Sequence, residues 1–210
     1  MTELVSNNYY YPNKLGLIIL QAMEEILDSN GINAVLNLSN QSHLINNYPP
    51  DNLDKQFQFS TISDILVALE EIYGLRGGHG LAIRSGRASF RYGLREFGPA
   101  IGISDTAFRL LPLPTKIREG ASILAETFNT YSDQLVRIED LPDYILWHID
   151  RCPICWQRST DRPVCHLAVG AIQEGLYWIS GGKYFNVEEI LCTAAGDPTC
   201  TIQINKVPLD

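Results

Sequence analysis

The chain has 210 residues, 45% of them apolar, and a net charge of −8. This size and composition fit one globular domain with an ordinary core. The acidic balance argues against a nucleic-acid-binding surface, which needs clustered Lys and Arg, and no apolar run approaches the roughly 18 residues that span a bilayer. The start of the chain lacks the apolar core of a signal peptide. We therefore expect a cytoplasmic protein whose five cysteines are free thiols or metal ligands.

The chain is expected to begin with a loosely held polar and aromatic arm, residues 1–13. Apolar residues at helical spacing predict a helix over 15–27. Asn30-Gly31 is a typical helix end, so we place the end of this helix there. The Asn-rich stretch 33–50 predicts turns.

Further helices are predicted before the middle of the chain. An amphipathic helix is expected over 62–73 with Thr61 as its N-cap. Four glycines in 74–80 separate it from another helix over 81–97. The region 104–133 predicts more helix, kinked at its two prolines.

The pattern then changes to strands. Residues 134–140 and 144–150 alternate with period two, which is typical of strands. A helix is expected over 163–179, followed by strands over 184–191 and 201–204.

The predicted elements divide the chain into a helical half, 14–133, and an α/β half, 134–210, packed as one compact domain. The fold class is α+β with an antiparallel sheet and one inserted helix. We also expect a homodimer, because four aromatic side chains of the helical half look exposed: Phe90, Tyr92, Phe97 and Phe108.

Four potential metal ligands are predicted to meet in the second half: Cys165, Glu189, Cys192 and Cys200. A hairpin brings Cys192 and Cys200 together, and the helix that starts near Cys165 can pack across it. Soft thiolates with one oxygen ligand suit a closed tetrahedral zinc site. A regular strand would turn Glu189 and Cys192 to opposite faces, so they can share a metal only if the strand is irregular near Leu191.

The same residues also have interpretations that involve no metal. Cysteines are often small buried apolar residues, and Glu189 can simply face solvent beside Glu188. His166 follows Cys165, but a histidine there is more often a surface or helix-end residue than a ligand. Cys152 and Cys155 form a C-x-x-C pair, for which a redox pair, a second metal site and displacement of Glu189 from the first site all stay open.

Aromatic side chains crowd the same half of the chain and predict an apolar ligand pocket lined by Trp147, His148 and Trp178. Core packing is the alternative for Trp147. His148 alternates to the opposite strand face from Trp147, so both line one pocket only if the strand is irregular. The sequence contains no nucleotide-binding loop and no group of residues that we can identify as catalytic. We therefore favour a binding protein over an enzyme.

The segment 189–200, with Glu-x-x-Cys, a Gly-Asp turn and a final Cys, resembles the signature of the 4-vinyl reductase domain family. In that family a helix that opens with Cys and contains Gly comes before the signature, as Cys165 and Gly170 do here. The resemblance is specific over 163–204 and extends to about 135. The family is related to phenol-sensing activator domains, heme-binding nitric oxide sensors and vesicle-tethering subunits.

This resemblance implies an α/β domain that dimerises through its helices and encloses an apolar pocket. It also implies zinc bound by Cys165, Glu189, Cys192 and Cys200. We therefore expect a zinc-containing sensor or carrier of a hydrophobic or aromatic molecule, working with a separate signalling partner. The alternatives are a tetrapyrrole 4-vinyl reductase or its accessory factor, and a structural dimeric adaptor.

Overall fold

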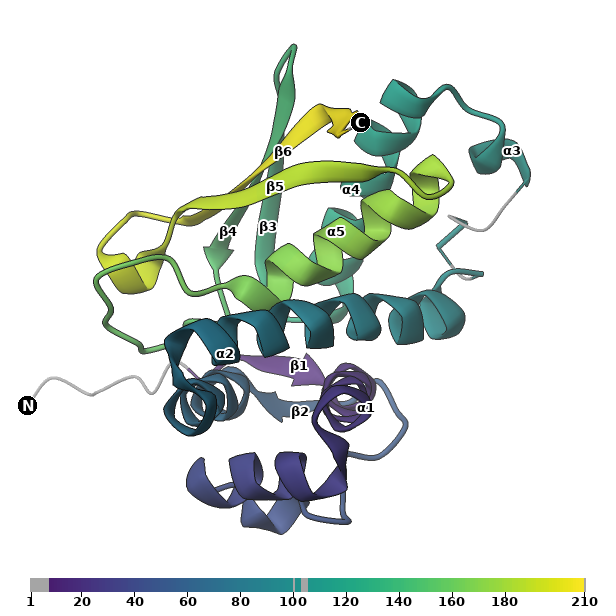
Figure 1. Ribbon diagram of the computed structural model, residues 1–210. Helices are drawn as coiled ribbons and strands as arrows, with labels where there is room; N and C mark the ends of the chain where they lie inside the picture. The colour runs from purple at the N-terminus through teal and green to yellow at the C-terminus, as the bar shows by residue number, and fades with distance from the viewer. Residues whose placement is uncertain (1–7, 100, 103–105, 210) are drawn as a thin grey trace, which may run out of the picture.

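The computed structural model describes residues 8–99, 101–102 and 106–209. A helical N-terminal part lies against a four-stranded antiparallel sheet (Figure 1). The strands follow the order β3-β4-β6-β5, and helices α4 and α5 pack against the sheet from the helical side. This arrangement confirms the predicted α+β class with one helix inserted between two strand pairs.

The described chain starts in a small sheet. Strand β1, Tyr10–Pro12, pairs antiparallel with β2, Lys55–Gln58. The last residues of the predicted arm are therefore held by backbone hydrogen bonds. Residues 1–7 of that arm lie outside the described residues.

Helix α1, Asn13–Leu38, contains a break at Asp28, whose backbone is non-helical with φ 59° and ψ 173°. The Asp28 carboxylate accepts hydrogen bonds of 2.8 and 2.9 Å from the backbone N–H groups of Asn30 and Gly31. It thus caps a second helical segment.

The predicted helix end at Asn30-Gly31 and the predicted turns over 33–38 are wrong, because α1 continues to Leu38. Ile32, Val35 and Leu36 of this second segment are fully buried, so core packing holds it helical. A short 3-10 helix, Ser42–Leu44, follows.

Helix α2, Phe59–Phe97, is likewise broken once, at Gly74 with φ 72°. The glycine-rich stretch after Gly74 is helical and not a loop. The helix also starts three residues earlier than expected. It follows Gln58, which makes no side-chain capping bond, and Thr61 lies inside the helix.

The remaining elements stand close to their predicted places. Helices α3, Thr106–Arg109, and α4, Leu113–Tyr131, precede strands β3, Leu135–Asp140, and β4, Tyr144–Arg151. Helix α5, His166–Ser180, ends at Gly181 with a left-handed φ of 76°. Strands β5, Tyr184–Leu191, and β6, Cys200–Leu209, complete the sheet, and β6 is longer than expected.

Helix α5 crosses α2 at two glycines and lies between α2 and the sheet (Figure 1). A Cβ atom on Gly86 would lie 2.0 Å from the carbonyl oxygen of Leu167. One on Gly170 would lie 2.1 Å from the carbonyl oxygen of Ile83. The two backbones therefore touch directly, and this contact fixes the position of α5.

The aromatic residues behind the homodimer prediction pack within the chain. Phe108 is buried, and Phe90, Tyr92 and Phe97 are half-buried. Within the described part of the chain, no helix combines the length and hydropathy needed to cross a membrane.

Candidate functional site: a thiol cluster beside an apolar cavity

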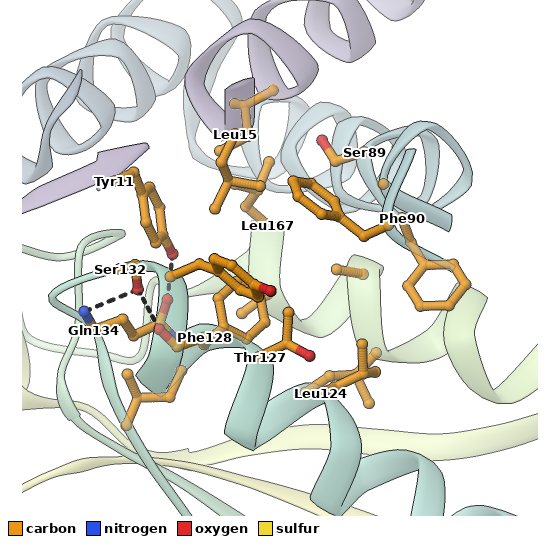
Figure 2. Close-up of a pocket in the computed structure, with 18 of the residues that line it drawn as sticks. Tyr11, Leu15, Ser89, Phe90, Leu124, Thr127, Phe128, Ser132, Gln134 and Leu167 are labelled. Carbon is orange, nitrogen blue, oxygen red and sulfur yellow. Dashed lines mark hydrogen bonds between the residues drawn. The ribbon is translucent and has the colours of Figure 1, made fainter. Parts of the chain in front are cut away.

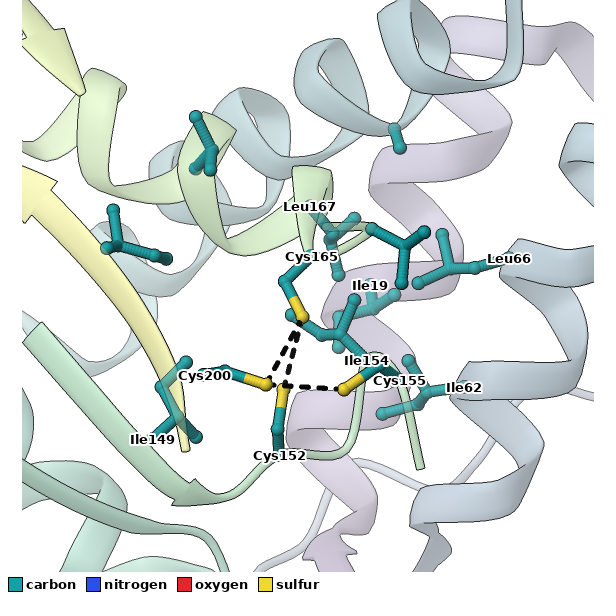
Figure 3. Packing of buried hydrophobic residues seen from close by; sticks show 14 of the residues in the cluster. Ile19, Ile62, Leu66, Ile149, Cys152, Ile154, Cys155, Cys165, Leu167 and Cys200 are labelled. Carbon is teal, nitrogen blue, oxygen red and sulfur yellow. Dashed lines mark hydrogen bonds between the residues drawn. The ribbon is translucent and has the colours of Figure 1, made fainter. Parts of the chain in front are cut away.

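All five cysteines meet at one place. Cys152 and Cys155 lie in the loop after β4, Cys165 is the N-cap of α5, and Cys192 and Cys200 flank the β5–β6 connection. Each side chain is buried, with at most 3% exposed. Figure 3 shows four of the sulfurs pointing toward one another.

The sulfur–sulfur distances fit a common metal centre. Cys165 Sγ lies 3.5 Å from Cys152 Sγ and 3.8 Å from Cys200 Sγ, and Cys155 Sγ lies 3.3 Å from Cys200 Sγ. Cys192 Sγ lies 4.0 Å from both Cys165 and Cys200. A disulfide would need about 2.05 Å. A tetrahedral centre with metal–sulfur bonds of about 2.3 Å has sulfurs about 3.8 Å apart.

Glu189 reaches the cluster from β5. The register between β5 and β6 shifts between Glu189 and Leu191, which is the irregularity that a shared site with Cys192 requires. Glu189 Oε2 accepts a 2.6 Å hydrogen bond from the backbone N–H of Cys165. Its Oε1 is buried and has no partner among the described residues. Burial, and next the charge of Cys192, raise the pKa of Glu189 to about 8.

The six groups form two overlapping sets of four ligands. One set is Cys152, Cys155, Cys165 and Cys200, and the other is Cys165, Glu189, Cys192 and Cys200. Within each set the ligand atoms all lie within 4.8 Å of one another. The C-x-x-C pair therefore lies next to the predicted ligands and shares Cys165 and Cys200 with them. His166 belongs to neither set; its ring packs against that of His79, with centroids 3.9 Å apart and planes tilted by 38°.

An apolar cavity of about 170 Å³ lies beside the cluster, between α1, α2, α4, α5 and strand β4 (Figure 2). Almost all of its wall is apolar. The larger side chains that line it include Leu15, Phe90, Leu124, Phe128, Trp147 and Leu167.

One end of the cavity carries polar groups. The Tyr11 hydroxyl donates a hydrogen bond to Gln134 Oε1, and Ser132 Oγ accepts a 3.0 Å bond from the Gln134 backbone N–H (Figure 2). Burial raises the pKa of Tyr11, so its phenol stays protonated. Sequence patterns could not find this pair, because its two members lie 123 positions apart.

The three predicted pocket residues occupy different places. Trp147 lines the cavity. His148 faces the other side of the sheet, with Nδ1 2.9 Å from Thr201 Oγ1, because β4 alternates regularly at this point. Trp178 lines a separate hollow beside Phe90 and Tyr177.

The cavity and the thiol cluster share a wall. Ile19, Ile149, Ile154 and Leu167 line the cavity, and Figure 3 shows the same side chains around the sulfurs. Ile154 belongs to the loop that holds Cys152 and Cys155.

Comparison with known proteins leaves the family open but supports the fold. No family model matches the chain, and no curated protein matches it. An H-NOX protein from S. oneidensis in the Fe(II)NO ligation state superposes with a TM-score of 0.56 at 14% identity, covering 92% of this chain and 98% of that one. An Fe(II) unliganded H-NOX protein from K. algicida gives 0.57 at 15% identity, covering 93% and 96%.

The phenol-responsive sensory domain of the transcription activator PoxR, solved with phenol, also superposes. Its TM-score is 0.53 at 16% identity, covering 72% of this chain and 77% of that one. Identities this low show a shared fold. The expected kinship with nitric oxide and phenol sensors is confirmed at that level, whereas membership of the 4-vinyl reductase family is not shown.

The prediction of Zn²⁺ as the cofactor is corrected by these comparisons. The names of two similar H-NOX structures refer to Fe(II), and another similar structure is described by its heme; none of these three names refers to zinc. The thiol ligands alone, on which the prediction rested, indicate a soft metal centre but do not specify the ion.

A heme group does not fit the cavity of this chain. Heme iron in proteins is held by an axial His, Cys, Met or Tyr. The described lining contains no His, Cys or Met. Of its two tyrosines, Tyr11 has its hydroxyl bonded to Gln134, and Tyr131 is 39% exposed. A cavity of about 170 Å³ is also suited to a much smaller molecule than a porphyrin.

Proposed function

We propose that this chain is a small-molecule-binding sensor or carrier domain, and that its ligand is a hydrocarbon or aromatic molecule with a single ring. The observation that carries the proposal is the cavity of about 170 Å³ with an almost wholly apolar wall. An apolar cavity of roughly 150 Å³ in another protein stays dry and binds benzene. The two volumes are similar, so one ring fills this site.

The polar end of the cavity favours a ligand with one hydroxyl group. The Tyr11 oxygen donates to Gln134 and can still accept a hydrogen bond from a ligand hydroxyl. A site with a few placed polar groups in an apolar wall is typical of small-molecule pockets. We therefore expect phenol-like molecules to bind there.

Two other functions are less well supported. A tetrapyrrole 4-vinyl reductase would need a larger cavity and a site for a redox cofactor. A purely structural adaptor gives no reason for a cavity with a buried hydrogen-bonded pair at one end. Membership of the 4-vinyl reductase domain family stays our proposal, supported by the convergence of the signature residues Glu189, Cys192 and Cys200.

The expected assembly and location also remain proposals. The aromatic side chains behind the homodimer prediction pack within the chain, so the support that remains is the resemblance. Light scattering at micromolar concentration tests it. A separate signalling partner and a cytoplasmic location are proposed on the same basis and on the odd number of cysteines.

Calorimetric titration of the full chain with phenol and toluene, and with the two-ring compound biphenyl, tests the proposed function. We expect the one-ring compounds to bind and to change tryptophan fluorescence, because Trp147 lines the cavity. Biphenyl should not bind. No binding of any one-ring compound would contradict the proposal.

A cavity-filling variant makes this test specific. Ala168 lines the cavity, so Ala168→Leu should abolish binding and leave the fold intact. Ala34→Leu adds the same atoms on an exposed position of α1 and should bind like the unaltered chain. Equal affinity in both variants would place the ligand elsewhere.

A further inference from the structure

We propose that the thiol cluster holds two thiophilic divalent metal ions, in two four-ligand sites that share the sulfurs of Cys165 and Cys200. This proposal is independent of the ligand in the cavity. It rests on the way in which six ligand groups from three parts of the chain are arranged.

The two overlapping ligand sets have the pattern of two tetrahedra joined along one edge. Cys165 and Cys200 belong to both sets, and their sulfurs lie 3.8 Å apart. Cys152 and Cys155 complete one set, whereas Glu189 and Cys192 complete the other. A thiolate sulfur has enough lone pairs to bridge two metal ions, so each ion obtains four ligands from six groups.

The remaining distances agree with this arrangement. Each terminal sulfur lies beside a bridging one: Cys152 is 3.5 Å from Cys165, and Cys155 is 3.3 Å from Cys200. On the other side, Cys192 lies 4.0 Å from both bridging sulfurs. All of these values lie near the edge of about 3.8 Å of a tetrahedral thiolate centre.

A single ion would leave two buried ligand groups without a metal. If the four cysteines of the first set held it, Glu189 and Cys192 would remain. Glu189 is 8% exposed, and its Oε1 has no partner among the described residues. A buried carboxylate oxygen without a partner is costly, and a metal ion bound at that oxygen removes the cost.

The charge of the cluster points the same way. Five thiolates and one carboxylate carry six negative charges when they bind metal. Two divalent ions neutralise four of these charges, whereas one ion neutralises only two. Thr193 adds outer hydrogen bonds, since its N–H donates to Cys200 Sγ at 3.3 Å and its hydroxyl lies 3.2 Å from Cys155 Sγ.

The stoichiometry of cobalt binding tests the proposal on the full chain, kept reduced and stripped of metal with a chelator. We expect the sulfur-to-cobalt absorption to saturate at two Co²⁺ per chain. Because the two ions share sulfurs, their spins should couple, and the spin resonance signal should be weaker than that of two isolated ions. Saturation at one Co²⁺ per chain would overturn the proposal.

Variants at the terminal ligands separate the two sites. Cys155→Ser and Cys192→Ser should each lower the stoichiometry from two to one. Glu189→Gln should weaken binding of one ion, whereas Glu188→Gln, on the exposed neighbouring residue, should leave both ions bound. Loss of all cobalt in Cys155→Ser, together with unchanged binding in Cys192→Ser, would indicate a single site instead. If a variant does not fold, the titration of the unaltered chain still decides between one and two ions per chain.

Discussion

Gly86 of α2 and Gly170 of α5 place the backbones of their two helices in direct contact. An added Cβ on either residue would lie within 2.1 Å of a carbonyl oxygen of the other helix. Helix α5 carries Cys165 at its start and lines the cavity with Leu167 and Ala168. The glycine contact therefore positions the thiol cluster and the cavity together.

Replacing Gly170 by alanine should destabilise the fold. The new methyl group would meet the backbone of Ile83, which cannot move aside as a flexible side chain can. We expect a loss of about 1–3 kcal/mol in the free energy of unfolding, as for other overpacked sites. Urea denaturation measures it.

Gly80→Ala is the matched control for this prediction. Gly80 lies in α2, and a Cβ there meets nothing within 4 Å. Alanine should stabilise that position by up to about 1 kcal/mol, because glycine is a poor helix former. If both variants lose the same stability, the contact between α2 and α5 is looser than the structure indicates.

A largely buried ion pair links the cysteine loop to α2. Arg158 Nη2 lies 2.6 Å from Glu70 Oε2, and the two side chains are only 9% and 13% exposed. Removing one partner leaves a buried charge, so Glu70→Leu should cost about 3–5 kcal/mol in urea denaturation.

The double variant Glu70→Leu with Arg158→Met should regain most of that stability, because no unpaired charge remains. Arg162→Ala breaks an exposed pair with Asp161 and should change the free energy of unfolding by less than about 1 kcal/mol. A double variant as unstable as Glu70→Leu alone would show that the cost is lost packing.

Local patterns in the sequence predicted strands better than helix ends. The alternation over 184–191 corresponds residue for residue to β5. In a half-buried strand, apolar and polar residues alternate along the strand itself, so the sequence of that segment is enough to predict it. Asp28 and Gly74 each interrupt a helix at one residue, after which the helix resumes. The residues that end a helix look the same in the sequence whether or not a second helical segment follows. After Asp28, the burial of Ile32 in the core favours such a segment.

The candidate site was partly visible in the sequence. The cysteines and Glu189 stand out by residue type, but the role of Cys152 and Cys155 depends on how a loop folds back. The contact between Tyr11 and Gln134 depends on packing of distant segments. The spacing of residues along the chain predicts neither the fold of the cysteine loop nor this contact.

Stability should fall as the pH drops below neutrality, in part because of His79. Burial is the main cause that lowers the pKa of His79, partly opposed by Glu70, and Arg162 and Arg158 lower it further. Its ring also packs on His166. The unfolded chain therefore binds a proton near pH 6.5, whereas the folded chain does so only at lower pH. Because the unfolded state binds more protons in this window, stability decreases as the pH falls through it.

His79→Gln should reduce this pH dependence. We expect the melting temperature to fall less between pH 7 and pH 5 in this variant than in the unaltered chain. His43→Gln changes an exposed histidine and should leave the pH dependence as it was. If the melting temperature of His79→Gln falls as much between pH 7 and pH 5 as that of the unaltered chain, His79 does not cause the pH dependence.

The polar end of the cavity should decide between hydroxylated and plain aromatic ligands. Tyr11→Phe removes the hydroxyl that can accept a hydrogen bond from phenol. One hydrogen bond contributes about 0.5–1.5 kcal/mol, so the affinity for phenol should fall roughly 2- to 13-fold. The affinity for toluene, measured by the same calorimetric titration, should change by less than about twofold.

Two controls keep this last prediction specific. Tyr11→Phe also leaves Gln134 Oε1 without its donor, so the double variant with Gln134→Leu should recover stability and still bind phenol more weakly than the unaltered chain does. Tyr131 also lines the cavity but is 39% exposed, and Tyr131→Phe should leave the ratio of phenol to toluene affinity unchanged. An equal loss of phenol affinity in Tyr11→Phe and Tyr131→Phe would show that the ligand does not recognise the buried end of the cavity through Tyr11.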